Sequence, residues 1–167
     1  RRYLETQVLP KQEIYSPTNW RAWQPYKPDA RQQDLKFDKF IEPFSGREDP
    51  FNWLFEHFNT AARRNKWIDD ECLIAVETYL TDAALAWWTG IRTRIHKWCE
   101  GEKHNGFQPG CFAHAFVQRF ITPEMRDSWN REYSQCRMQD GEDVASYADR
   151  LRELVKRISL TRLIQDD

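Results

Sequence analysis

The sequence has little of several features that would point to a membrane or a nucleic acid. It contains no apolar run close to the roughly 18 residues that a membrane-spanning helix needs, because charged residues interrupt every candidate. No secretory signal pattern opens the chain. Neither sign of charge dominates, since 25 Lys and Arg stand against 26 Asp and Glu. A surface devoted to nucleic acid is normally basic, so this balance of charge argues against one. Since the chain has neither a membrane-spanning run nor a secretory signal pattern, we expect an intracellular, cytoplasmic, globular protein without a membrane partner.

The chain is also poor in residue patterns that carry chemistry. It has no glycine-rich phosphate loop, no G-x-S-x-G and no H-E-x-x-H. Adjacent carboxylates at Asp69, Asp70 and Glu71 suit the first turn of a helix, where the helix dipole favours negative charge. We therefore predict that the protein is not an enzyme and has no catalytic residues and no cofactor.

The cysteines do not form a metal-binding pattern. There are four, widely scattered, and they are typical of reduced, mostly buried thiols (Cys72, Cys99, Cys111 and Cys136). Two of them alternate with histidines as C-x4-H-x6-C-x2-H (Cys99, His104, Cys111 and His114). That spacing is not the spacing of a zinc finger, knuckle or ribbon, so we predict no metal site.

Helical signals fill the chain from Asp49 onward. Asp49 is a good N-cap, and Pro50 suits the first helical position. An apolar stripe at helical spacing follows (Phe51, Leu54, Phe55, Phe58 and Ala62), while Trp53 points away from it. A third helix is expected from Thr81 or Asp82 with an apolar face that continues to Trp98, and Thr122-Pro123 opens a fifth. The last helix carries apolar residues from Val144 to Ile158, and no alternating strand pattern occurs, so the predicted fold is all-α.

Residues 1–43 differ from the rest. Five prolines interrupt any helical period there, yet the segment is rich in aromatic residues (Tyr15, Trp20, Trp23 and Tyr26). Either it is a flexible arm, or it is an extended arm whose aromatics dock on the helical body or on a neighbouring subunit.

Four sequence pieces follow one another in a recognisable order. They are F-x-G-x-x-x-[DP]-x-x-W-L over Phe44–Leu54, Y-L-x-x-x-A-x-x-W-W over Tyr79–Trp88, F-x-x-x-F-x-x-x-F over Phe112–Phe120, and Q-x-G-E-x-V-x-x-Y-x-x-R over Gln139–Arg150. Together they resemble the capsid region of Gag from gypsy-type LTR retrotransposons. They also resemble the Arc-like animal proteins domesticated from such Gags, and more distantly retroviral capsid.

The resemblance implies a retroviral-capsid-like helical bundle. It assigns residues 1–43 to an extended N-terminal arm, 44–138 to the N-terminal capsid lobe with a linker helix, and 139–167 to the truncated start of the C-terminal lobe. In this family a Gln, a Glu and an Arg hydrogen-bond to one another across a turn and helix. Carried over, that network comprises Gln139, Gly141, Glu142 and Arg150.

The resemblance also implies a structural function. The chain would self-assemble as a homo-oligomer into a virus-like shell that packages the element's RNA, mainly through segments outside this chain. The alternative is a domesticated Gag-like lobe that binds a host peptide and acts as a scaffolding module. Candidate contacts with the arm, a peptide or another subunit are Trp20, Trp23, Trp53, Leu85, Val144, Tyr147, Leu151 and Leu154.

Overall fold

The computed structural model describes residues 35, 37–102 and 105–164. Within these residues the chain is mostly helical, which confirms the all-α prediction at that level. Trp20, Trp23 and most of the predicted arm (residues 1–34 and 36) lie outside the described residues.

The first helix begins where the sequence places it. The Asp49 carboxylate accepts a hydrogen bond from the Asn52 N–H at 3.1 Å, and Pro50 opens the helix. The helix has π geometry over η1 (Asn52–Phe58) and continues as α2 (Asn59–Arg64). The predicted stripe is wholly buried (Phe51, Leu54, Phe55, Phe58 and Ala62). Because π hydrogen bonds reach five residues back, residues four apart on η1 lie close to one line along the helix.

The next two helices form one side of the body. They are α3 (Asp69–Tyr79) and α4 (Asp82–Ile91), followed by the short 3-10 turn η2 (Arg92–Arg94). The expectation of one helix to Trp98 is wrong, because α4 ends at Ile91 after Gly90. Beyond η2 the chain is extended, and the Lys97 and Trp98 carbonyls accept from the Phe112 and Ala113 N–H groups at 2.8 and 3.0 Å. These bonds satisfy the free donors at the start of α5 (Phe112–Phe120).

A small β-hairpin lies between η2 and α5. Strand β1 (Gly101–Glu102) pairs antiparallel with β2 (Gly106–Phe107). The far edge of β2 is taken by the end of the described chain: Phe107 N–H donates to Arg162 O, and Ile164 N–H donates to Phe107 O, both at 2.9 Å. Residues Arg162–Ile164, which follow the last helix, are thereby fixed to the body.

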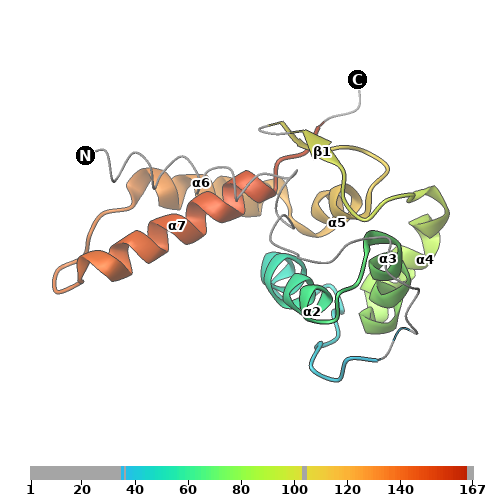
Figure 1. The fold of residues 1–167 in the computed structure, drawn as a ribbon. Helices are drawn as coiled ribbons and strands as arrows, with labels where there is room; N and C mark the ends of the chain where they lie inside the picture. The colour runs from blue at the N-terminus through green and yellow to red at the C-terminus, as the bar shows by residue number, and fades with distance from the viewer. Residues whose placement is uncertain (1–34, 36, 103–104, 165–167) are drawn as a thin grey trace.

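Helices α6 (Pro123–Gln135) and α7 (Val144–Leu160) lie side by side as a hairpin that projects from the body (Figure 1). The predicted N-cap of α6 is present, since Thr122 Oγ1 accepts from Met125 N–H at 3.2 Å. Trp129 of α6 and Leu154 and Leu160 of α7 belong to the same buried cluster as the body residues. The hairpin is therefore joined to the core rather than separate from it.

Candidate interaction surfaces

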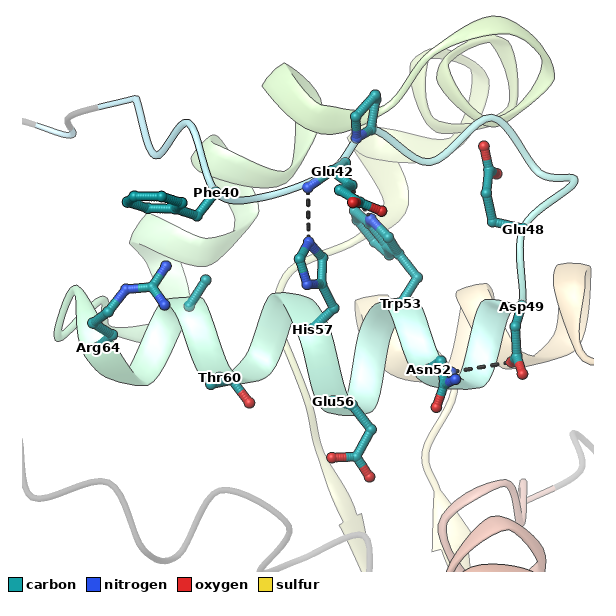
Figure 2. A pocket seen from close by; sticks show the side chains of 12 residues that line it. Phe40, Glu42, Glu48, Asp49, Asn52, Trp53, Glu56, His57, Thr60 and Arg64 are labelled. Atoms are coloured by element: carbon teal, nitrogen blue, oxygen red, sulfur yellow. Dashed lines mark hydrogen bonds between the residues drawn. The ribbon is translucent and has the colours of Figure 1, made fainter.

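Residues 38–44, here called the strap, cross the outer face of η1 and α2 (Figure 2). One end is held at Asp38, whose carboxylate lies 2.6 Å from Arg64 Nη2 and 2.7 Å from Asn65 Nδ2. The Asp38 N–H donates to the Tyr79 hydroxyl at 2.6 Å. Burial raises the pKa of Asp38, but the hydrogen bonds from Arg64 and Asn65 outweigh it and hold the pKa below its ordinary value. The carboxylate is thus a charged anchor for the strap.

The middle of the strap is bound through both main-chain polar groups of one residue, Glu42. The Glu42 carbonyl accepts from Trp53 Nε1–H, and the Glu42 N–H donates to His57 Nε2, each at 2.7 Å (Figure 2). Trp53 and His57 are four residues apart on η1, so one face of this helix supplies both partners. Ile41 and Phe44 beside them point into the core and are 3% and 0% exposed.

Trp53, which the sequence predicts to contact the arm or a partner, is buried. It is 4% exposed, and its ring centroid lies 5.1 Å from Phe44 and 5.4 Å from Phe58. Outside the apolar stripe it contacts the strap, and its ring also stacks on Phe116 of α5 with the centroids 6.0 Å apart. A partner molecule could reach the indole only after the strap moves.

A groove of about 560 Å³ runs along η1 and α2 next to the strap. Phe40, 67% exposed, stands at one end, and Asp49 and Asn52 lie at the other (Figure 2). Four carboxylates line it (Glu42, Glu48, Asp49 and Glu56). Asp49 pairs with Arg157 at 3.1 Å, and Glu56 pairs with Lys156. The groove is open, and its lining mixes apolar and charged side chains.

The predicted network before α7 is assembled around one ion pair. Arg150 binds Glu142 bidentately, with Nε–Oε2 and Nη2–Oε1 distances of 2.8 and 2.7 Å. Gln139 takes part through its main chain: its N–H donates to Glu142 Oε1 at 3.1 Å, and its carbonyl accepts from Glu142 N–H at 3.0 Å. Gly141 has φ +78°, the left-handed region that favours glycine. The structure therefore brings all four of these residues to one turn.

The other candidate contacts are spread over two helices. Val144 is 71% exposed at the start of α7, Tyr147 and Leu151 are partly buried against the core, and Leu154 is 9% exposed. The stripe of α7 thus packs back on α6 and the body except at its first turn. Leu85 of α4 is also partly buried against the core.

The basic residues on α7 are engaged with carboxylates. Arg150 pairs with Glu142, Arg152 with Asp149, Lys156 with Glu56, and Arg157 with both Asp49 and Glu153. A phosphate backbone would compete with these partners. This helix is therefore a weak candidate for a nucleic-acid surface.

The described residues of the cysteine and histidine pattern contact main-chain groups of the protein. Cys111 Sγ accepts from His114 N–H at 3.3 Å as the cap of α5, and His114 Nε2 lies 3.0 Å from Ile164 O. Burial raises the pKa of the Cys111 thiol. His104 lies outside the described residues, and within those residues no group of three or more His, Cys, Asp or Glu could hold a metal. Nor does any helix of that part have the length and apolarity to cross a bilayer.

Sequence reasoning missed three residues that organise these surfaces: Asp38, His57 and Arg157. His57 follows Trp53 by four positions, which is a signal that was available. The partners of Asp38 and Arg157 lie far along the chain, and nothing in the local pattern indicates them. Comparison of the chain with protein-family models, curated proteins and solved structures found no match.

Proposed function

We propose that this chain is the capsid region of a Gag protein from a gypsy-type LTR retrotransposon. It self-assembles into a virus-like shell, while the element's RNA is packaged mainly through other segments of the polyprotein. The observation that carries the proposal is the turn formed by Gln139, Gly141, Glu142 and Arg150. The resemblance assigns a hydrogen-bonded network to these positions, and the bidentate Glu142–Arg150 pair supplies its central bond.

Three further features support a structural function. The described body is a helical lobe with an aromatic core, and the α6–α7 hairpin projects from it (Figure 1). Val144, Met138 and Tyr133, near the junction of the two hairpin helices, are 71%, 53% and 47% exposed. Many small contacts suffice for a shell, because repeated weak interfaces sum through avidity.

The test is the mass of the nuclease-treated protein as a function of concentration and salt. Size-exclusion chromatography with light scattering should show a mass that climbs with concentration, and negative-stain electron microscopy of the heavy fractions should show rings, tubes or shells. A monomer at every concentration and salt would contradict self-assembly by this chain.

A matched pair of variants examines the turn itself. Arg150→Ala should raise the concentration needed for half-assembly by about tenfold, equivalent to about 1.4 kcal/mol. Arg152→Ala removes an exposed charge two residues away on the same helix and should assemble as the unmodified protein does. Equal assembly of the two variants would show that the turn does not contribute to assembly.

A second candidate function is supported by the groove beside the strap. We propose, as the alternative, a domesticated Gag-like lobe that captures an extended host peptide there, with Phe40 as its exposed aromatic contact. Fluorescence anisotropy with labelled Pro- and aromatic-rich peptides should then show saturable binding that Phe40→Ala weakens. A protein that stays monomeric and binds such peptides would favour this module over the shell, and absence of binding would contradict it.

A further inference from the structure

The hydrogen bond between the strap and His57 constrains the protonation state of this imidazole. The Glu42 N–H is a donor, and it points at His57 Nε2 from 2.7 Å (Figure 2). A main-chain N–H can only donate, so Nε2 must offer its lone pair. The imidazole is therefore neutral in this arrangement, with its proton on Nδ1.

Protonation changes Nε2 from an acceptor into a second donor. Two N–H groups would then face each other across 2.7 Å, and the bond from Glu42 would be lost. Histidine is the side chain whose charge ordinarily changes between pH 7 and pH 5. The strap is thus closed by a contact that protonation of His57 removes.

Carboxylates predominate among the charged side chains that line the groove at His57. Four carboxylates line the same groove: Glu42 and Glu48 from the strap and the loop after it, and Asp49 and Glu56 from the start of the helix and η1. Arg64 of α2 also lines it, but Arg64 is paired with Asp38. From α7, Arg157 and Lys156 pair with Asp49 and Glu56. Carboxylates therefore outnumber cations among the groups that line this groove.

We propose that residues 38–44 are a pH-sensitive strap, latched by neutral His57, that loosens over Trp53 when His57 is protonated. The loosening is local. Ile41 and Phe44 remain buried, and the Asp38 carboxylate keeps its bonds to Arg64 and Asn65. The bonds that open are those at the main chain of Glu42: its N–H leaves His57, and its carbonyl leaves the indole N–H of Trp53. This strap lies within the single folded chain, so its loosening does not depend on assembly.

Hydrogen exchange followed by NMR tests the strap directly. Protection of the Glu42 N–H and of the Trp53 indole N–H, each relative to its intrinsic rate, should fall together by about tenfold between pH 7.5 and pH 5.5. In His57→Gln both protections should stay constant, because the amide oxygen accepts a hydrogen bond without titrating. His96→Gln, at an exposed histidine outside the groove, should behave as the unmodified protein.

Nitrogen chemical shifts of His57 in the unmodified protein provide a second readout that needs no variant. At pH 7.5 they should show the proton on Nδ1, and the loss of protection should follow the titration curve of His57. A proton on Nε2 at pH 7.5, unchanged protection at pH 5.5, or a loss of protection that persists in His57→Gln would each overturn the proposal.

Discussion

At the scale of the residue, Glu142 is held by a set of donors that all favour its charged form. The hydrogen bonds from Arg150, then the bond from the Gln139 N–H, keep the pKa of Glu142 below its ordinary value. Because the pKa is lower in the folded state, the carboxylate stabilises the fold fully above the ordinary Glu pKa of about 4.3. This contribution is lost as pH falls through the lower, folded-state pKa.

Glu142→Gln should therefore be less stable than the unmodified protein at pH 7, and the difference should shrink on acidification toward pH 3. Urea unfolding at a series of pH values measures it. Asp149→Asn is the control, since Asp149 is 71% exposed and pairs only with a neighbour on the same helix. A difference for Glu142→Gln that is the same at pH 7 and pH 3 would contradict the charge argument.

At Gly106 the segment Arg162–Ile164 lies close against the β-hairpin. A Cβ there would lie 2.6 Å from the Arg162 carbonyl carbon and oxygen, and φ is +116°. Gly110 has a comparable φ of +92°, but nothing lies within 4 Å of its hypothetical Cβ. The two positions thus separate backbone strain from steric overlap.

Gly106→Ala should cost about 1–3 kcal/mol more than Gly110→Ala, because only the former displaces residues 162–164 from β2. Urea unfolding measures the difference, and hydrogen exchange of the Ile164 N–H should rise only in Gly106→Ala. Equal costs would mean that the close approach of Arg162 contributes nothing to stability.

At the scale of the element, Arg157 joins three helices. Its guanidinium lies 4.8 Å from the Phe51 ring centroid and 5.3 Å from that of Trp129, and its side chain is only 15% exposed. It also pairs with Asp49 and Glu153, each at 3.1 Å. One side chain of α7 therefore contacts α6 and the beginning of the η1 helix together.

Arg157→Ala should lower the free energy of unfolding by about 2 kcal/mol, the scale of a cation–π contact that is largely removed from water. Arg152→Ala, which loses only an exposed pair with Asp149, should cost under about 0.5 kcal/mol. Urea denaturation of both variants provides the comparison. Similar costs would show that Arg157 does not fix the hairpin to the body.

At the scale of the whole molecule, one continuous core links the body and the hairpin of α6 and α7. Trp129 lies 6.1 Å from Phe51, and Leu154 and Leu160 belong to the same buried cluster. The predicted boundary between residues 138 and 139 therefore falls within a hairpin whose two helices share that core. The boundary between the two lobes stays a prediction.

We expect the described chain to unfold in one cooperative transition. Tryptophan fluorescence reports mainly on the body and far-ultraviolet circular dichroism on all helices, so the two should give coincident urea curves. An earlier transition seen only by circular dichroism would mean that α6 and α7 melt independently of the body.

Local chemistry in the sequence was enough to predict the helices and their starts. Asp49 and Thr122 cap where expected, and the stripe from Phe51 to Ala62 is buried, because capping and amphipathic spacing act within a few residues. The expected continuation of α4 to Trp98 failed. Helical spacing there was real, but Trp98 stacks on Phe112 at 4.5 Å, and its carbonyl caps α5 from an extended segment. Tertiary packing of Trp98 therefore outweighed the helical spacing of the apolar residues before it.

Local interactions in the sequence set the helical class and the capped starts at Asp49 and Thr122, because capping and amphipathic spacing act within a few residues. The residues of the turn from Gln139 to Arg150 are an expectation of the family resemblance, and they too lie within a dozen positions of one another. Contacts between segments far apart in the chain, in contrast, were visible only in the tertiary structure. The strap bound to Trp53 and His57, the seating of Arg162–Ile164 on β2, and the place of Arg157 between Phe51 and Trp129 are of this kind. Their partners are separated by up to about a hundred residues, and no local spacing can select one distant partner from many of the same chemistry.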